Sequence, residues 1–166
     1  MKKLPLVAAF LLSGLLICTS FTPKKPGKQP VTIQITMVQK TGQLWANMTF
    51  TNQSAAPVYL NKLDIGMSPR LMNNLFILQQ KGQEVPYAGI LVKRRPPTQD
   101  DFVLLPPGKS VKTTIRLDQS YAFKSGKNRY SIQYRHYHSS PKDAAVFHEF
   151  TSKRYYFDYA AANLKS

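Results

Sequence analysis

The chain has almost no cysteine and few acidic residues. It contains one cysteine, Cys18, and 8 acidic residues against 23 lysines and arginines, which gives a formal net charge of +15. Without a second cysteine the chain cannot form an internal disulfide, and an exported protein does not require one. Beyond residue 20 no apolar run approaches the roughly 20 residues that cross a bilayer. We therefore expect no transmembrane segment in the mature chain.

The first twenty residues have the layout of an export signal. Lys2 and Lys3 precede an apolar stretch, and the small residues Cys18 and Ser20 occupy the −3 and −1 positions of a cut after residue 20. This layout predicts a cleavable signal peptide over residues 1–20 and a periplasmic or extracellular protein. A lipid anchor on Cys18 is the alternative. A lipobox has a small residue directly before its cysteine, and Ile17 weighs against this alternative.

Composition divides the remainder into three parts. Residues 21–30 are rich in proline and lysine and predict an extended basic leader. Residues 31–160 are long enough for one domain and short for two. Residues 161–166 are expected to be a C-terminal tail.

Apolar and polar residues alternate along most of the domain. Such period-two runs predict half-buried strands, and the longest pass through residues 31–37, 44–51, 111–117 and 130–135. Glycine- or proline-containing turns separate them, including those at Gly108 and Gly126. The pattern predicts an all-β, immunoglobulin-like antiparallel sandwich of about seven to eight strands. Helix is expected only as one turn within residues 68–74 and in the alanine-rich tail from Ala160.

One tyrosine supports the immunoglobulin-like version of the sandwich. Tyr130 follows the turn at Gly126 and begins an alternating strand. A tyrosine corner has a phenol in this position, which donates a hydrogen bond to the backbone upstream. The alternative is that Tyr130 is simply a core aromatic residue.

A set of residues between positions 85 and 135 carries a resemblance to a known family, with weaker matches upstream at Thr51-Asn52 and Pro57-Val58. The set comprises Pro86, Tyr87, Gly89, Val92-Lys93-Arg94, Pro97-Thr98, Asp101-Phe102, Leu105, Pro107-Gly108, Ser110, Leu117-Asp118, Tyr121, Gly126 and Tyr130 to Arg135. These residues resemble the non-catalytic N-terminal, immunoglobulin-like domain of bacterial deuterolysin and peptidyl-Lys (aspzincin) metallopeptidases.

The catalytic motifs of that family are absent from this sequence. The family's protease domain carries HExxH and a later GTxxD, whereas the nearest segment here, at residues 148–152, has no second histidine. Two histidines at i and i+4 are needed to place two zinc ligands on one helical face. We therefore expect no catalytic residue, no cofactor, no zinc site and no peptidase activity.

Three histidines offer a weaker alternative. His136 and His138 flank one residue, so in a strand they point to the same face, and His148 could supply a third metal ligand. The competing interpretation is a solvated strand end.

The loop from Val92 to Asp101 is the predicted contact surface. Its charged residues are Lys93, Arg94, Arg95, Asp100 and Asp101. The two adjacent acids should point to opposite sides, and we expect them to pair with the basic residues and fix the loop's shape.

We therefore expect an exported, non-catalytic binding module whose partner is a protein such as a secreted protease. Two alternatives remain open. One is an inhibitor or folding helper acting in trans on a secreted zinc protease. The other is an electrostatic binder of anionic envelope polymers, favoured by the positive charge. Nucleic acid is not an expected partner, since alternation places Tyr130 and Tyr134 in the core.

Overall fold

The structure is a computed structural model, and it describes residues 29–161. The predicted signal peptide, Cys18 and most of the predicted leader lie outside the described residues, as do residues 162–166 of the predicted tail.

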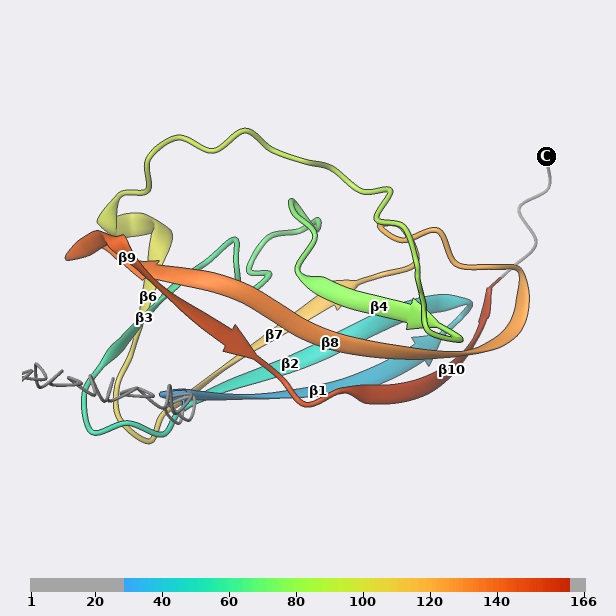
Figure 1. Cartoon of the computed structure of the whole chain (residues 1–166), viewed down its shortest axis with the longest axis horizontal. Helices are drawn as coiled ribbons and strands as arrows, with labels where there is room; N and C mark the ends of the chain where they lie inside the picture. Colours follow the sequence, from blue (N-terminus) through green and yellow to red (C-terminus); the bar gives the residue numbers. More distant parts are fainter. Residues whose placement is uncertain (1–28, 162–166) are drawn as a thin grey trace, which may run out of the picture.

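The described chain is an antiparallel β-sandwich (Figure 1). One sheet has the order β1-β2-β7, and the facing sheet has the order β10-β8-β4-β5, with β9 also paired to β8. This is the immunoglobulin-like strand order A-B-E facing G-F-C-C′. A small sheet of β3 and β6 lies beside them. The strands are β1 (Val31–Lys40), β2 (Gln43–Asn52), β3 (Val58–Asn61), β4 (Phe76–Gln80), β5 (Gln83–Glu84), β6 (Phe102–Leu105), β7 (Ser110–Arg116), β8 (Gly126–Ser140), β9 (Asp143–Thr151) and β10 (Tyr155–Ala161).

The apolar residues of the alternating strands are buried between the sheets, as the sequence predicted. Along β1, Val31, Ile33 and Ile35 are buried, and their neighbours Thr32 and Gln34 are exposed. The inward residues of β2 meet those of β8 between the sheets, for example where the rings of Phe50 and Tyr134 lie 5.3 Å apart, edge to face. Tyr130 and Tyr134 are buried, which confirms their predicted core positions.

β8 is the longest strand and carries two partners along one edge. β10 pairs with its first half and β9 with its second half. Between β9 and β10 the chain leaves the ladder at Ser152. There the Ser152 hydroxyl accepts the Tyr134 N–H at 2.9 Å, and the Ser152 N–H donates to the Tyr134 carbonyl at 3.0 Å. This interruption is one reason why ten strands are present instead of seven to eight. The others are the short strands β3, β5 and β6, which carry too little alternation to be recognised.

The predicted helical turn within residues 68–74 is wrong. This segment consists of bends, and the described helical turn is instead the 3₁₀ turn η1 (Gln99–Asp101). The Asn74 carboxamide oxygen accepts hydrogen bonds from the Phe76 N–H and the Tyr121 hydroxyl, at 3.4 and 2.7 Å. These bonds turn the chain into β4. A helical tail from Ala160 is also wrong for the described part, because Ala160 and Ala161 complete β10 opposite Lys127 and Gly126.

Tyr130 combines the two roles that the sequence left open. Its ring is buried, and its hydroxyl donates to the Lys124 carbonyl at 3.4 Å, as a tyrosine corner requires. β8 begins at Gly126, whose φ of 76° is in the left-handed region that glycine adopts without strain. Gly108, in the turn before β7, has a φ of 70°.

Candidate functional site

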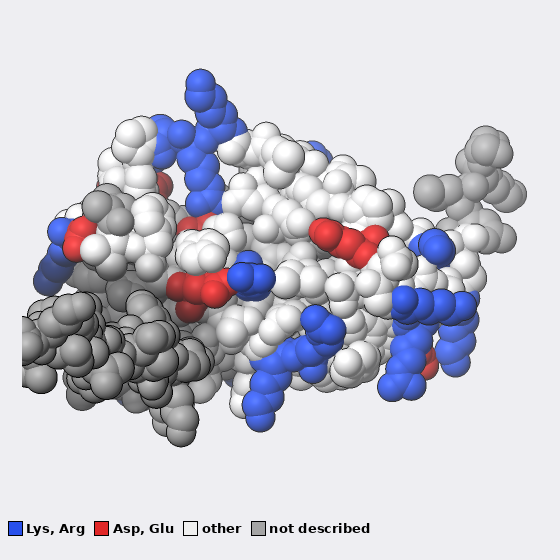
Figure 2. All heavy atoms as spheres, viewed as in Figure 1, with Lys and Arg blue, Asp and Glu red and all other residues white. Residues whose placement is uncertain are grey.

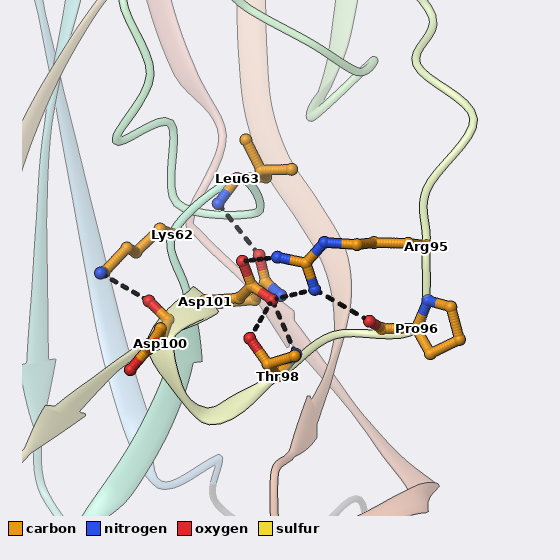
Figure 3. A network of polar contacts seen from close by, with 8 residues as sticks. Lys62, Leu63, Arg95, Pro96, Thr98, Asp100 and Asp101 are labelled. Carbon is orange, nitrogen blue, oxygen red and sulfur yellow. Dashed lines mark hydrogen bonds and ion pairs between the residues drawn. The ribbon is translucent and has the colours of Figure 1, made fainter.

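The loop from Val92 to Asp101 is exposed along almost its whole length and has no regular structure before η1. Its end is closed by Asp101, whose carboxylate accepts the Thr98 N–H at 2.7 Å and the Thr98 hydroxyl at 3.0 Å (Figure 3). Arg95 lies 2.9 Å from the same carboxylate. The Thr98 backbone hydrogen bond, with smaller contributions from the Thr98 hydroxyl and Arg95, holds the pKa of Asp101 below its usual value. The loop is therefore shaped by its own charges.

Lys62, which directly follows β3, ties this loop to the sandwich. Its ammonium group donates to the Asp100 carbonyl at 2.6 Å, and its N–H donates to the Asp101 carbonyl at 2.8 Å. Figure 3 shows the two acids of the loop turned in different directions, with only Asp101 facing Arg95. The expected pairing across the loop thus exists between Arg95 and Asp101, and Asp100 contributes its backbone.

Arg94 instead reaches out of the loop to a buried carboxylate. Its guanidinium lies 2.5 Å from Asp64, which is 5% exposed, and His136 of β8 lies 3.0 Å from the same oxygen. Burial by itself would raise the pKa of Asp64. The contacts with His136 and Arg94 outweigh that effect and hold the pKa below its usual value. Asp64 therefore fastens the loop to β8.

A buried tyrosine and histidine continue this cluster into the core. The Tyr134 hydroxyl lies 2.7 Å from the Asp64 carbonyl and 2.6 Å from His138 Nε2. A carbonyl only accepts, so the hydroxyl proton points to Asp64 and His138 donates from Nε2. Burial lowers the pKa of His138 to about 4, which keeps the ring neutral. Its Nδ1 then carries a lone pair that has no partner among the described residues.

The three candidate metal ligands do not converge. His136 and His138 share one face, with ring centroids 5.9 Å apart, but each Nε2 already contacts another group. His148 pairs with His138 across the β8–β9 ladder and is exposed. Within residues 29–161 no group of three or more histidine, cysteine or acidic residues is arranged to hold a metal ion. The expectation of no metal remains a prediction.

The loop and the end of β8 line an open pocket of about 500 Å³. The end of β3 and the segment after it, the loop, β8 and β9 all contribute to its lining. The lining comprises Asn61, Leu63, Asp64, Val92, Lys93, Arg94, Arg95, Pro97, Asp101, His136, Tyr137, Ser139 and Phe147. A second open pocket, of about 710 Å³, lies between the β8–β9 hairpin and the small sheet and is lined in part by Tyr59, Leu104, His138 and His148.

The basic residues elsewhere are dispersed. On the face drawn in Figure 2, lysines and arginines stand in separate groups with uncharged surface between them, and some lie beside acidic residues. Arg116 pairs with Asp118, and Arg135 pairs with Glu149. On this face, therefore, the positively charged side chains do not form one continuous patch.

Sequence reasoning identified the loop but missed what holds it. Asp64 is a single acid in the segment after β3, and its partners Arg94 and His136 lie 30 and 72 positions away. Tyr134 was identified only as a core residue. No local pattern joins these residues.

No family model matches this chain. The chain is 33% identical over 102 residues to a protein of Aeromonas hydrophila named extracellular protease. The match covers 61% of this chain and 29% of that protein, so the chain corresponds to less than a third of the relative. The chain is therefore related to part of an extracellular protease.

Proposed function

We propose that this protein is an exported, non-catalytic binding module that acts on or beside a secreted protease. The observation that carries the proposal is the 33% identity to a limited part of an extracellular protease. The proposal includes the finer relationship that the sequence suggests, namely to the N-terminal domain of aspzincin metallopeptidases without their protease domain. The match covers only 29% of the relative, so most of that protease has no counterpart in the matched part of this chain.

The chemistry of the described residues supports a non-catalytic role. The buried titratable groups of the cluster contact one another: Asp64 with Arg94 and His136, and Tyr134 with His138. Groups engaged in this way fix the position of a loop.

None of the helical turns between residues 29 and 161 has the length or the apolar composition to cross a membrane.

The braced loop supports a binding role. Exposed loops on a rigid sandwich are frequent sites of recognition, and a loop that is already ordered loses less entropy when a partner binds. Here Arg94, Arg95 and Lys62 each fix part of the loop from Val92 to Asp101.

The experiment uses the Aeromonas hydrophila extracellular protease as the probe. We expect the purified protein to hydrolyse no casein by itself and to bind the protease in a fluorescence anisotropy titration. A triple alanine variant of Lys93, Arg94 and Arg95 should bind at least about tenfold more weakly, because it removes the charges of the loop and their ordering. Casein hydrolysis by the protein alone would contradict the non-catalytic role, and equal binding by the variant would remove the loop from the proposal.

The same titration separates a passive module from an inhibitor or folding helper. A passive module leaves the initial rate of casein hydrolysis and the refolding yield of the protease unchanged. An inhibitor lowers the rate in proportion to occupancy, and a folding helper raises the yield of active protease after dilution from denaturant.

An electrostatic role for anionic envelope polymers is the second candidate, and the net charge of +15 favours it. The test is retention on a heparin column. Elution below physiological salt would exclude this role, and retention above it would support it.

A further inference from the structure

β8 continues well past the end of its neighbour β4. The β4–β8 pairing runs from Gln80 opposite Tyr130 to Phe76 opposite Tyr134. One further bond follows on this edge, from the Arg135 N–H to the Leu75 carbonyl at 3.2 Å. β8 itself extends to Ser140 (Figure 1). The last part of β8 therefore pairs with β9 on one edge and with no described strand on the other.

The free edge presents backbone hydrogen-bonding groups. In an antiparallel strand the N–H and C=O of alternate residues point to the same edge. The N–H of Arg135 points to the β4 edge, so the N–H and C=O of Tyr137 point to it as well. The regular register with β9 holds through His138, which keeps this alternation intact at Tyr137. An unpaired strand edge is a template for another extended chain.

A pocket lies along this edge. Tyr137 and Ser139 of β8 line the pocket of about 500 Å³, with Val92, Lys93 and Pro97 of the loop among its other lining residues. Arg94 extends from the loop to Asp64, beside His136. A chain lying here would pair with the part of β8 that the β4 pairing does not reach.

The side chains around the pocket indicate the composition of such a chain. Val92, Tyr137 and Phe147 are 42, 55 and 61% exposed, which is a large apolar surface for one pocket. Among the three basic residues, Arg94 and Arg95 are ion-paired, whereas Lys93 has no hydrogen bond or ion pair with any residue of the described chain. Apolar side chains would cover the exposed rings, and a carboxylate would pair with Lys93.

We propose that β8 binds an extended segment of a protein partner that alternates apolar and acidic residues, as an added antiparallel or parallel strand next to Tyr137. This inference rests on the proposed binding function and specifies its site and ligand class. Backbone hydrogen bonds supply affinity in this mode, and alternate side chains supply specificity.

The test uses a fluorescein-labelled seven-residue peptide that alternates glutamate with valine and phenylalanine. Two further versions are N-methylated on the glutamates or on the apolar residues. Only one of these two sets of N–H groups can face β8, so one version should bind like the parent. The other should bind about tenfold more weakly, which corresponds to the loss of about one or two hydrogen bonds. Equal binding of both methylated versions would overturn the strand-addition mode.

Protein variants locate the site. Tyr137→Pro removes the N–H that faces the free edge, and Tyr137→Ala removes only the ring. We expect the proline variant to bind about tenfold more weakly than the alanine variant. Lys93→Glu should weaken binding about fivefold or more at low salt, and Lys112→Glu on β7, which is also exposed, should leave it unchanged. Circular dichroism of each variant checks its folding, and the methylated peptides provide a test that leaves the protein unaltered.

Failure of this inference is distinguishable from failure of the proposed function. If no version of the peptide binds, the edge site is wrong, and binding to the protease still decides the proposed function. If the peptide binds but Tyr137→Pro and Lys93→Glu have no effect, the site at this edge is also wrong.

Discussion

Replacing Gly66 with alanine tests how tightly the segment that carries Asp64 is packed against the core. Gly66 has a φ of +73°, and an added Cβ would lie 2.1 Å from Ile115 Cδ1 and 2.7 Å from Ile115 Cγ1. Ile115 is 4% exposed and belongs to the core between the sheets, so its side chain has little room to move. The new methyl group must therefore displace packed atoms or shift the backbone next to Asp64.

Two costs contribute to the expected loss of stability. The left-handed conformation costs a non-glycine residue about 1–2 kcal/mol. Overpacking a filled core costs about 1–3 kcal/mol. We expect Gly66→Ala to lower the free energy of unfolding by about 2–5 kcal/mol, against a total of about 5–15 kcal/mol for a typical domain. Urea unfolding followed by fluorescence of Trp45, the single tryptophan, measures this loss.

Gly82→Ala is the matched control. Gly82 has a φ of +80°, but an added Cβ there meets nothing within 4 Å. The difference between the two variants therefore isolates the packing contribution. In addition, Ile115→Val removes the closest atom, so the double variant should recover part of the loss. If Gly66→Ala and Gly82→Ala differ by less than about 0.5 kcal/mol, the packing argument is refuted.

Two further predictions concern the candidate site. Because burial lowers the pKa of His138 from 6.5 to about 4, the unfolded chain takes up a proton below pH 6.5 that the folded chain does not. Stability should fall by up to about 3 kcal/mol between pH 6.5 and 4, and His138→Phe should remove this part of the slope in urea unfolding at successive pH values. An unchanged slope would show that another group is responsible. Asp101→Asn weakens the contacts with Thr98 and Arg95, so the loop should open more often. Trypsin should therefore cleave after Lys93 several-fold faster in the variant than in the original protein. Equal digestion rates would show that Asp101 does not hold the loop.

Much of the architecture could be predicted from local patterns. The alternation in β1, β2 and β8 identified which residues face the core, because a half-buried strand repeats every two residues. The helical turn expected within residues 68–74 was wrong. Leu71 and Leu75 are buried there by a chain that turns through Asn74, and this burial depends on packing against the sheets.

The candidate site could be predicted only in part. The charged loop was recognisable as a contact surface from its composition, and its pairing between Arg95 and Asp101 spans six positions. The attachment of Arg94 to Asp64 could not be anticipated, since the two residues are brought together by the packing of the loop against the segment after β3.

The sequence by itself determined the all-β character, the inward face of the main strands and the position of the exposed basic loop, since each depends on residues close together along the chain. Only the tertiary structure decided that Asp64, Arg94, Tyr134 and His136 meet, and that β8 extends beyond β4 to leave an open edge. Both depend on how strands distant in sequence pair and how far each extends. A hydrophobic pattern specifies which face of a strand is buried but leaves the length and partner of each edge undetermined.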